Sequence, residues 1–148
     1  MANLPAQFRQ ALSTNLLTFT KFRELLNKVE AYRPSDDLEP LRRAYQTAAQ
    51  FHGNQRRHSG ELYLAHPVAV ADILAELRMD IPTLQTALLH DVVEDTQMTI
   101  EEVRSQFGAE VADLVAGVTK IGKFEFASRE ERQARSEEQT SELQSRFG

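Results

Sequence analysis

Residues 88–96 read L-L-H-D-V-V-E-D-T, a stretch that sets one imidazole and three carboxylates among aliphatic side chains. A helix turns by about 100° per residue, so the polar residues at 90, 91, 94 and 95 share an arc of about 140°. The aliphatic residues at 88, 89, 92 and 93 fall on the opposite face. This pattern predicts an amphipathic helix with its aliphatic side in a core.

The polar face of this helix has two interpretations. The face can simply be exposed to solvent, because like charges one turn apart destabilise a helix by only about 0.2–0.5 kcal/mol per pair. A metal site is the alternative, since His90 and Asp91 offer one nitrogen and one oxygen ligand, a set that suits manganese, iron or zinc better than calcium. A divalent cation also relieves the repulsion among clustered carboxylates. The sequence leaves both interpretations open.

A metal site needs at least one further protein ligand. The zinc-protease spacing H-E-x-x-H is absent. Of the other histidines, His66 is the best candidate, because Pro67 favours a helix start there and the imidazole can project beyond the first turn. A simple helix cap is the alternative for His66. We expect His52 to pack near a helix end.

Helical periodicity dominates the rest of the chain and predicts an all-α domain. We expect helices over 15–31, 37–51, 66–79, 81–95, 100–107 and 109–116. Strand-like alternation occurs only over 122–127. Residues 1–12 carry weak signals.

Several helix ends carry specific signals. Ser35 and Asp36 are candidate caps for the second helix. Thr99 with Glu102 forms a capping box, and Met98 with Val103 a hydrophobic staple. The two stops of the last helices are expected at glycines, at positions 108 and 117.

Composition places the chain among ordinary globular proteins. It has 148 residues, 41% hydrophobic and 26% charged, with a formal net charge of −5 and no cysteine. We expect one domain, no membrane span, no secretory signal and a cytoplasmic location. The acidic balance argues against nucleic-acid binding, although the basic run Arg56-Arg57-His58 could hold one phosphate-bearing ligand. A solvated loop is the alternative for that run.

The C-terminal tail differs in kind from the rest. Residues 135–145 read R-S-E-E-Q-T-S-E-L-Q-S, which is similar to the translation of a common sequencing-library adapter except at Gln139. We therefore expect 135–148 to be a non-native tail that lies outside the functional domain. A genuine polar helix is the alternative, because the segment has fair helix propensity.

Three blocks in order carry a resemblance to a known family. They are Q-R-R-H-S-G-E-L-Y-L-A-H-P-V-A-V-A at 55–71, L-L-H-D-V-V-E-D-T at 88–96 and G-V-T-K-I-G-K at 117–123. Together they resemble the N-terminal hydrolase region of the RelA/SpoT homologues, the enzymes that make and degrade the alarmone (p)ppGpp. The similarity implies an HD-domain-like helical bundle, incomplete at its C-terminus. It divides the chain into an N-terminal helical segment (1–34), a partial HD-type hydrolase domain (35–134) and the tail (135–148).

The resemblance also implies a site. It assigns His66, His90 and Asp91 as ligands of Mn²⁺, and Glu94 and Asp95 as the catalytic acidic pair. The family's fourth ligand is an Asp in a segment of the type L-A-D-R-x-H-N, and this chain has no such segment. With three ligands we expect weak metal affinity and little turnover.

The implied substrate contacts lie in the basic loop. The resemblance assigns them to Arg57, His58 and Ser59, although His58 stands where the family more often has another residue and Leu62 replaces a frequent proline. The resemblance is therefore incomplete at positions 58 and 62.

The implied reaction is removal of the 3′ pyrophosphate from ppGpp or pppGpp in the stringent response. Synthetase and regulatory domains are expected downstream in a longer parent protein, and no membrane or nucleic-acid partner is expected for this region. Two alternatives stay open. One is a catalytically silent regulatory HD module, and the other is an HD phosphohydrolase that acts on another nucleotide.

Overall fold

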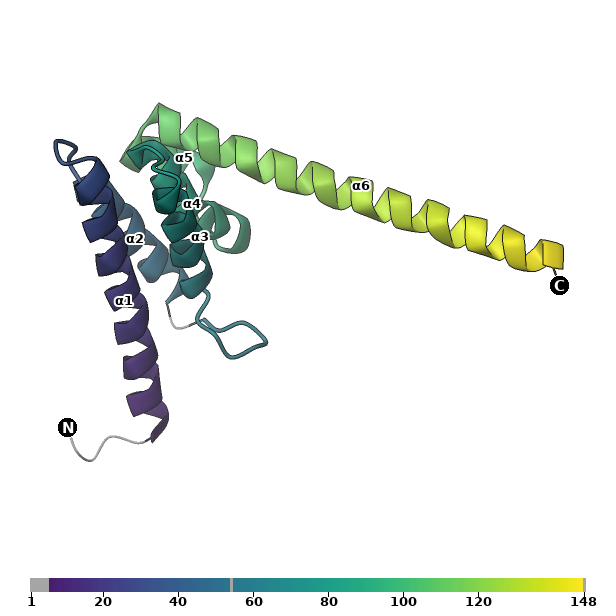
Figure 1. The fold of residues 1–148 in the computed structure, drawn as a ribbon, viewed down its shortest axis with the longest axis horizontal. Coiled ribbons are helices and arrows are strands. Elements are labelled where there is room, and N and C mark those ends of the chain that lie inside the picture. The colour runs from purple at the N-terminus through teal and green to yellow at the C-terminus, as the bar shows by residue number, and fades with distance from the viewer. Residues whose placement is uncertain (1–5, 54, 148) are drawn as a thin grey trace. The chain divides into compact units, whose positions relative to one another are not determined.

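The computed structural model describes the backbone of residues 6–53 and 55–147. It describes the surroundings of the side chains in the same ranges, except at 7–15, 123–126 and 135–147. Six α-helices are present in the described residues, where an isolated bridge between Arg56 and Leu62 is the one feature of β type (Figure 1). The helices are α1 (Ala6–Tyr32), α2 (Glu39–His52), α3 (Ala65–Glu76), α4 (Ile81–Asp95), α5 (Ile100–Phe107) and α6 (Ala109–Phe147). The expected all-α fold is confirmed. None of the described helices is both long and apolar enough to cross a membrane.

The chain divides into two units, Met1–Val115 and Ala116–Gly148. In the first unit α4 packs against both α2 and α3, and α3 packs against α1. The side chains at the centre of this packing are fully buried, among them Leu25, Leu41, Leu84, Leu88 and Leu89. Helix α4 is therefore the central helix of the first unit, as its aliphatic face predicts.

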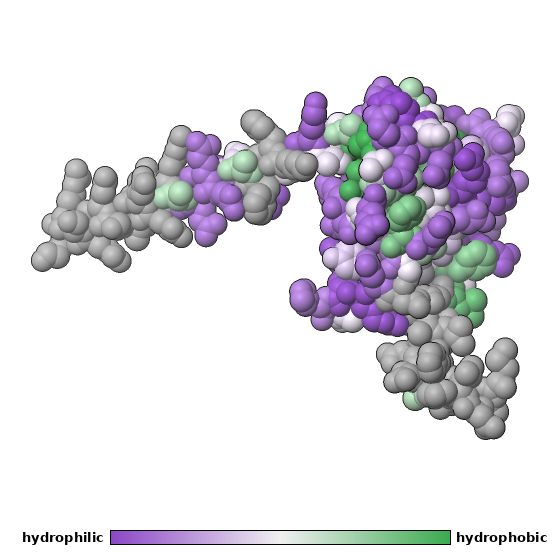
Figure 2. Space-filling view, turned by 180° about the vertical axis from the view of Figure 1, so that it is seen from behind, coloured by the Kyte–Doolittle hydropathy of each residue, from purple (hydrophilic) through white to green (hydrophobic). Residues whose placement is uncertain are grey.

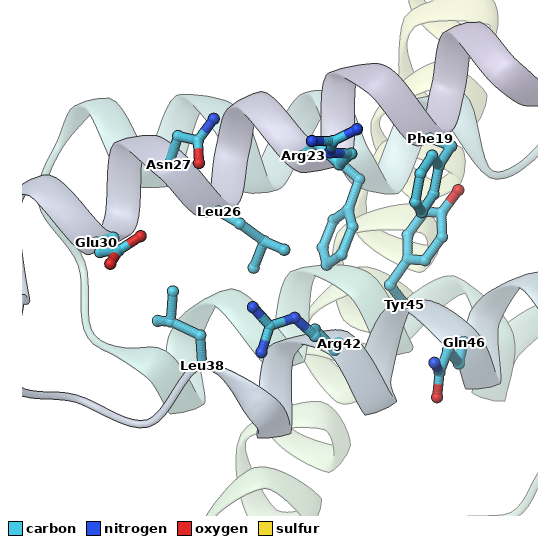
Figure 3. Close-up of a pocket in the computed structure, with 10 residues that line it drawn as sticks. Phe19, Arg23, Leu26, Asn27, Glu30, Leu38, Arg42, Tyr45 and Gln46 are labelled. Atoms are coloured by element: carbon cyan, nitrogen blue, oxygen red, sulfur yellow. The ribbon is translucent and has the colours of Figure 1, made fainter.

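Helices α1 and α2 meet through aromatic rings. Phe22 stacks on Tyr45 with ring centroids 4.2 Å apart, and Phe19 lies 6.3 Å from Tyr45 in a tilted arrangement. Beside these rings is a pocket of about 440 Å³, where Leu26, Leu38 and Arg42 converge between the two helices (Figure 3). Polar residues cover most of the molecular face in Figure 2, with apolar patches between them.

Side chains cap the starts of α4 and α5, and the cap expected at Thr99 is confirmed. Asp80 caps α4, since its carboxylate accepts a hydrogen bond from the Thr83 backbone N–H at 3.0 Å. Thr99 caps α5 by accepting from the Glu102 backbone N–H at 3.1 Å. The Thr99 hydroxyl also lies 3.3 Å from the Glu102 carboxylate. Short polar side chains that satisfy free N–H groups fix these helix starts.

The starts of α2 and α3 differ from expectation. Helix α2 begins after Leu38 without a side-chain cap, so the expectation for Ser35 and Asp36 is wrong; Asp37 instead accepts from the Glu39 N–H at 3.0 Å. Helix α3 begins at Ala65, which makes His66 its second residue rather than its cap, and it ends at Glu76 rather than near residue 79.

Helix α6 also departs from expectation. Gly108 does end α5, with a positive φ of 98°. Gly117 was expected to stop the next helix, but α6 continues through it, and the strand-like residues 122–127 are helical. A glycine inside a helix costs only about 1 kcal/mol relative to alanine, which strong helix formers on both sides can offset. The tail is helical as far as Phe147; its non-native origin and the division at residues 34/35 stay predictions.

Candidate metal and nucleotide site

The candidate site is built on the C-terminal half of α4. The aliphatic face of that helix is buried, with Leu88, Leu89 and Val92 all fully inaccessible to solvent. The opposite face carries His90 and Asp91, which are half-buried, and Glu94 and Asp95, which are exposed. The two-sided pattern expected from the sequence is confirmed, and packing against α2 and α3 holds the polar side in one orientation.

Three side chains on this face form a compact group. His90, Asp91 and Glu94 each offer one ligand atom, and these atoms all lie within 4.8 Å of one another. His90 Nε2 lies 3.0 Å from Asp91 Oδ1, and only 21% and 14% of the two side chains is exposed. One imidazole nitrogen and two carboxylate oxygens suit a divalent transition metal, so the residues fit a metal ion of this class.

The His90–Asp91 contact shifts the pKa of both groups. The hydrogen bond that His90 donates to the Asp91 carboxylate raises the pKa of His90 above its ordinary value of 6.5, although burial opposes this. Burial alone would raise the pKa of Asp91, but the His90 hydrogen bond and nearby histidine charges outweigh it and lower the pKa. The pair therefore favours a positive charge beside a negative one, the arrangement that a metal cation would replace.

His66 lies outside the compact group. It is half-buried near the start of α3, and its charge is one of those that lower the Asp91 pKa, so it lies within electrostatic reach of Asp91. Asp95, the last residue of α4, is also outside the group. The structure thus brings together His90, Asp91 and Glu94, while ligation by His66 and a role for Asp95 stay predictions.

The basic loop between α2 and α3 carries the three expected substrate residues. Arg57, His58 and Ser59 are all exposed. The loop folds back on itself, because the Arg57 backbone N–H donates to the Glu61 carbonyl at 2.8 Å and the Gly60 N–H donates to the Arg57 carbonyl at the same distance. This places the three side chains near the turn of the loop, where a ligand could reach them.

Two residues near this loop were not assigned a role from the sequence. His52, at the end of α2, is only 1% exposed, and neither of its ring nitrogens has a hydrogen-bond partner. Its ring stacks on Tyr63, 5.5 Å between centroids. The expectation that His52 packs near a helix end is confirmed. The one feature of the sequence that could have drawn attention to Tyr63 is its place, as an aromatic residue between a basic turn and the start of a helix.

Comparison with known proteins gives matches over most of the chain. The sequence profile described as HD domain matches residues 44–145. The bifunctional (p)ppGpp synthase/hydrolase SpoT of Escherichia coli (strain K12) is 48% identical over 113 residues, 76% of this chain and 16% of that protein. The guanosine-3′,5′-bis(diphosphate) 3′-pyrophosphohydrolase of Aquifex aeolicus is 50% identical over 105 residues, 71% of this chain and 15% of that protein. A protein of Myxococcus xanthus named GTP pyrophosphokinase is 50% identical over 109 residues, 72% of this chain and 14% of that protein.

These matches bear on the expected boundaries. The chain spans only 14–16% of the length of these relatives. The HD domain match begins at residue 44 and extends past residue 134 into the segment that resembles an adapter. The similarity to proteins of the RelA/SpoT type, expected from the three sequence blocks, is confirmed.

Proposed function

The chain belongs to the HD domain family, and from this premise we propose that it is the hydrolase region of a bifunctional (p)ppGpp synthetase/hydrolase. The reaction is hydrolysis of the 3′ pyrophosphate of ppGpp or pppGpp, which yields GDP or GTP and pyrophosphate. Relatives named for this hydrolysis share about half of their aligned residues with this chain. The absence of cysteine and the nucleotide substrate support a cytoplasmic location.

In this proposal His90 and Asp91 hold a Mn²⁺ ion, with His66 as a further ligand. The clustering of His90, Asp91 and Glu94 supports a metal ion at this place. When bound, a divalent ion of this kind lowers the pKa of a water molecule and polarises a phosphate oxygen. The family's fourth ligand has no counterpart in this chain, so we expect its metal affinity to be weak and its turnover low.

The acidic pair at the end of α4 acts beside the metal ligands. Glu94 lies one turn beyond His90 and is exposed, so its carboxylate can accept a hydrogen bond from the attacking water and take its proton. We expect Asp95 to assist the departure of the pyrophosphate. General acid–base assistance of this kind contributes typically about 10²–10⁴-fold in rate.

The basic loop binds the nucleotide. The Arg57 guanidinium can donate two parallel hydrogen bonds to a phosphate or stack on guanine, and Ser59 and His58 add hydrogen-bonding groups at the same turn. Binding energy at this loop holds the 3′ pyrophosphate against the α4 cluster. Because the chain spans only 14–16% of the length of its relatives, we infer that synthetase and regulatory domains follow this region in a longer parent protein.

One observation carries the proposal: the ligand atoms of His90, Asp91 and Glu94 lie within 4.8 Å of one another in a chain of the HD domain family. The test has two parts. Mn²⁺-dependent binding of ppGpp is measured by calorimetry for this chain, for His90→Ala and for Glu94→Gln. Pyrophosphate release is measured for the same variants in a form whose tail from residue 135 is replaced by the parent protein's own continuation, which supplies the fourth ligand.

The expected results separate the two residues. His90→Ala should abolish Mn²⁺ dependence and activity, whereas Glu94→Gln should keep ppGpp binding and lower the rate of pyrophosphate release by about 10²–10⁴-fold. Full activity in both variants would show that the site is assigned wrongly. Binding without release in the extended form would favour a silent regulatory module, and preference for another nucleotide would favour a different HD phosphohydrolase.

A further inference from the structure

Tyr63 contacts both the basic loop and the buried end of α2. The guanidinium carbon of Arg57 lies over the Tyr63 ring, 5.6 Å from its centroid. The His52 ring lies 5.5 Å from the same centroid and nearly parallel to it, with 16° between the planes. Three side chains, one exposed, one half-buried and one buried, thus form a column from the loop surface into the core.

Backbone hydrogen bonds hold Tyr63 in place. Its N–H donates to the Gln55 carbonyl at 2.9 Å, which closes the base of the basic loop. Its neighbours Leu62 and Leu64 are 1% and 6% exposed, so both are anchored in apolar surroundings. The Tyr63 ring therefore sits on a fixed base, while the Arg57 side chain above it is otherwise free to sample solvent.

His52 gives the column its inner end. With 1% exposure and no partner for either ring nitrogen, its imidazole is held by packing and by the Tyr63 ring. His52 is the last residue of α2, the helix that packs against α4. The inner end of the column therefore belongs to a helix in contact with the helix that carries the candidate metal site.

We propose that Tyr63 is a positioning residue for nucleotide binding: its ring holds the Arg57 guanidinium in one orientation relative to the α4 cluster. The inference rests on the proposed function, because it assigns Tyr63 to the binding of the same substrate. A guanidinium that is already held by an aromatic face loses less side-chain entropy when a phosphate or guanine binds. The aromatic face is what matters, and the phenolic hydroxyl is dispensable.

The test is a comparison of ppGpp affinity, measured by calorimetry in the presence of Mn²⁺. Tyr63→Leu should weaken binding by about two- to fivefold, the range of an exposed cation–π contact. Tyr63→Phe keeps the ring and should bind as the unsubstituted chain does. Phe107→Leu is the matched control, because it removes another arginine–aromatic pair, Arg43 over Phe107 at 5.3 Å.

A double-mutant cycle separates positioning from general support of the loop. In an Arg57→Leu background, Tyr63→Leu should cause no additional loss of affinity. Equal loss in both backgrounds, or no loss in either, would overturn the inference. Loss in Tyr63→Phe equal to that in Tyr63→Leu would do the same.

Two readouts keep this result distinct from other failures. If the unsubstituted chain does not bind ppGpp, the proposed function fails and the positioning role fails with it. If the chain binds ppGpp but substitution of Tyr63 does not change the affinity, only the positioning role fails.

The NMR signal of the Arg57 Hε proton reports the contact with the Tyr63 ring directly. It should carry a ring-current shift in the unsubstituted chain and in Tyr63→Phe, and lose it in Tyr63→Leu; an unshifted signal in the unsubstituted chain would contradict the proposal even if Tyr63→Leu unfolds.

Discussion

His90 Nε2 lies 3.0 Å from Asp91 Oδ1, and both side chains are half-buried on the polar face of α4. A proton shared at this contact stabilises the pair, and a metal ion at the same place would compete with that proton. The contact therefore links the stability of the metal-free protein to pH.

The first prediction concerns stability in the presence of a chelator. The pKa of His90 is raised in the folded state, so its contribution to stability is fully present below the unfolded value near 6.5 and is lost as pH rises through the folded value. The free energy of unfolding, measured with urea in EDTA, should therefore fall as pH rises above about 6.5. Asp91→Asn removes the partner and should abolish this fall. An unchanged pH profile in Asp91→Asn would contradict the assignment of the effect to this pair.

The second prediction tests His66 as a ligand. At a free Mn²⁺ concentration about ten times the Kd, binding should raise the free energy of unfolding by roughly 1.4 kcal/mol. His66→Ala should remove most of this gain at the same Mn²⁺ concentration, because it removes a ligand that lies on a different helix from His90. His58→Ala is the control for metal binding, since His58 lies in the exposed loop. Equal Mn²⁺ stabilisation in His66→Ala would show that the ion, if bound, is held by α4 alone.

The sequence predicted the central part of the fold well because the decisive interactions there are local. The Asp80 and Thr99 caps act on N–H groups within three residues, and the Thr99 pattern alone places the start of α5. The start of α2 was missed because no side chain caps the helix at Leu38; this residue is instead buried, with 9% of its surface exposed. The prediction that Gly117 ends a helix was wrong because a single glycine only weakens a helix and need not end it.

The candidate site divides in the same way. His90, Asp91 and Glu94 follow from helical spacing, because one helix presents all three. His66 comes from another helix, so only tertiary packing decides how close it comes, and spacing along the chain carries no such information. The role proposed for Tyr63 was missed because it depends on two contacts of its ring, with His52 and with Arg57. These residues lie eleven and six positions away in the sequence, and only the fold of the loop brings them to the ring.

The third prediction concerns the Asp80 cap. Asp80→Ala should lower the free energy of unfolding by about 1 kcal/mol at neutral pH, because the Thr83 N–H loses its acceptor. Asp80→Asn should retain most of the stability, as asparagine caps about as well. The Thr83 hydrogen bonds lower the pKa of Asp80, so its contribution is present above the unfolded value near 3.8 and is lost as pH falls through the folded value. Urea unfolding measures the difference in the free energy of unfolding between each protein and Asp80→Ala. For the unsubstituted chain this difference should be smaller at acidic than at neutral pH, whereas for Asp80→Asn it should not change. A gap that stays constant in the unsubstituted chain would argue against an ionised cap.

The last prediction tests whether the aliphatic side of α4 is the centre of the core. Leu88 is fully buried, so Leu88→Ala should lower the free energy of unfolding by about 2–5 kcal/mol through lost burial and the cavity left behind. Leu77→Ala is the matched control, since Leu77 is 62% exposed and its truncation should change stability by no more than about 0.5 kcal/mol. Both changes are measured by urea unfolding followed by circular dichroism. Similar small losses in the two variants would mean that α4 does not pack as the central helix, and the half-buried environment of His90 and Asp91, on which the metal site depends, would then lack its support.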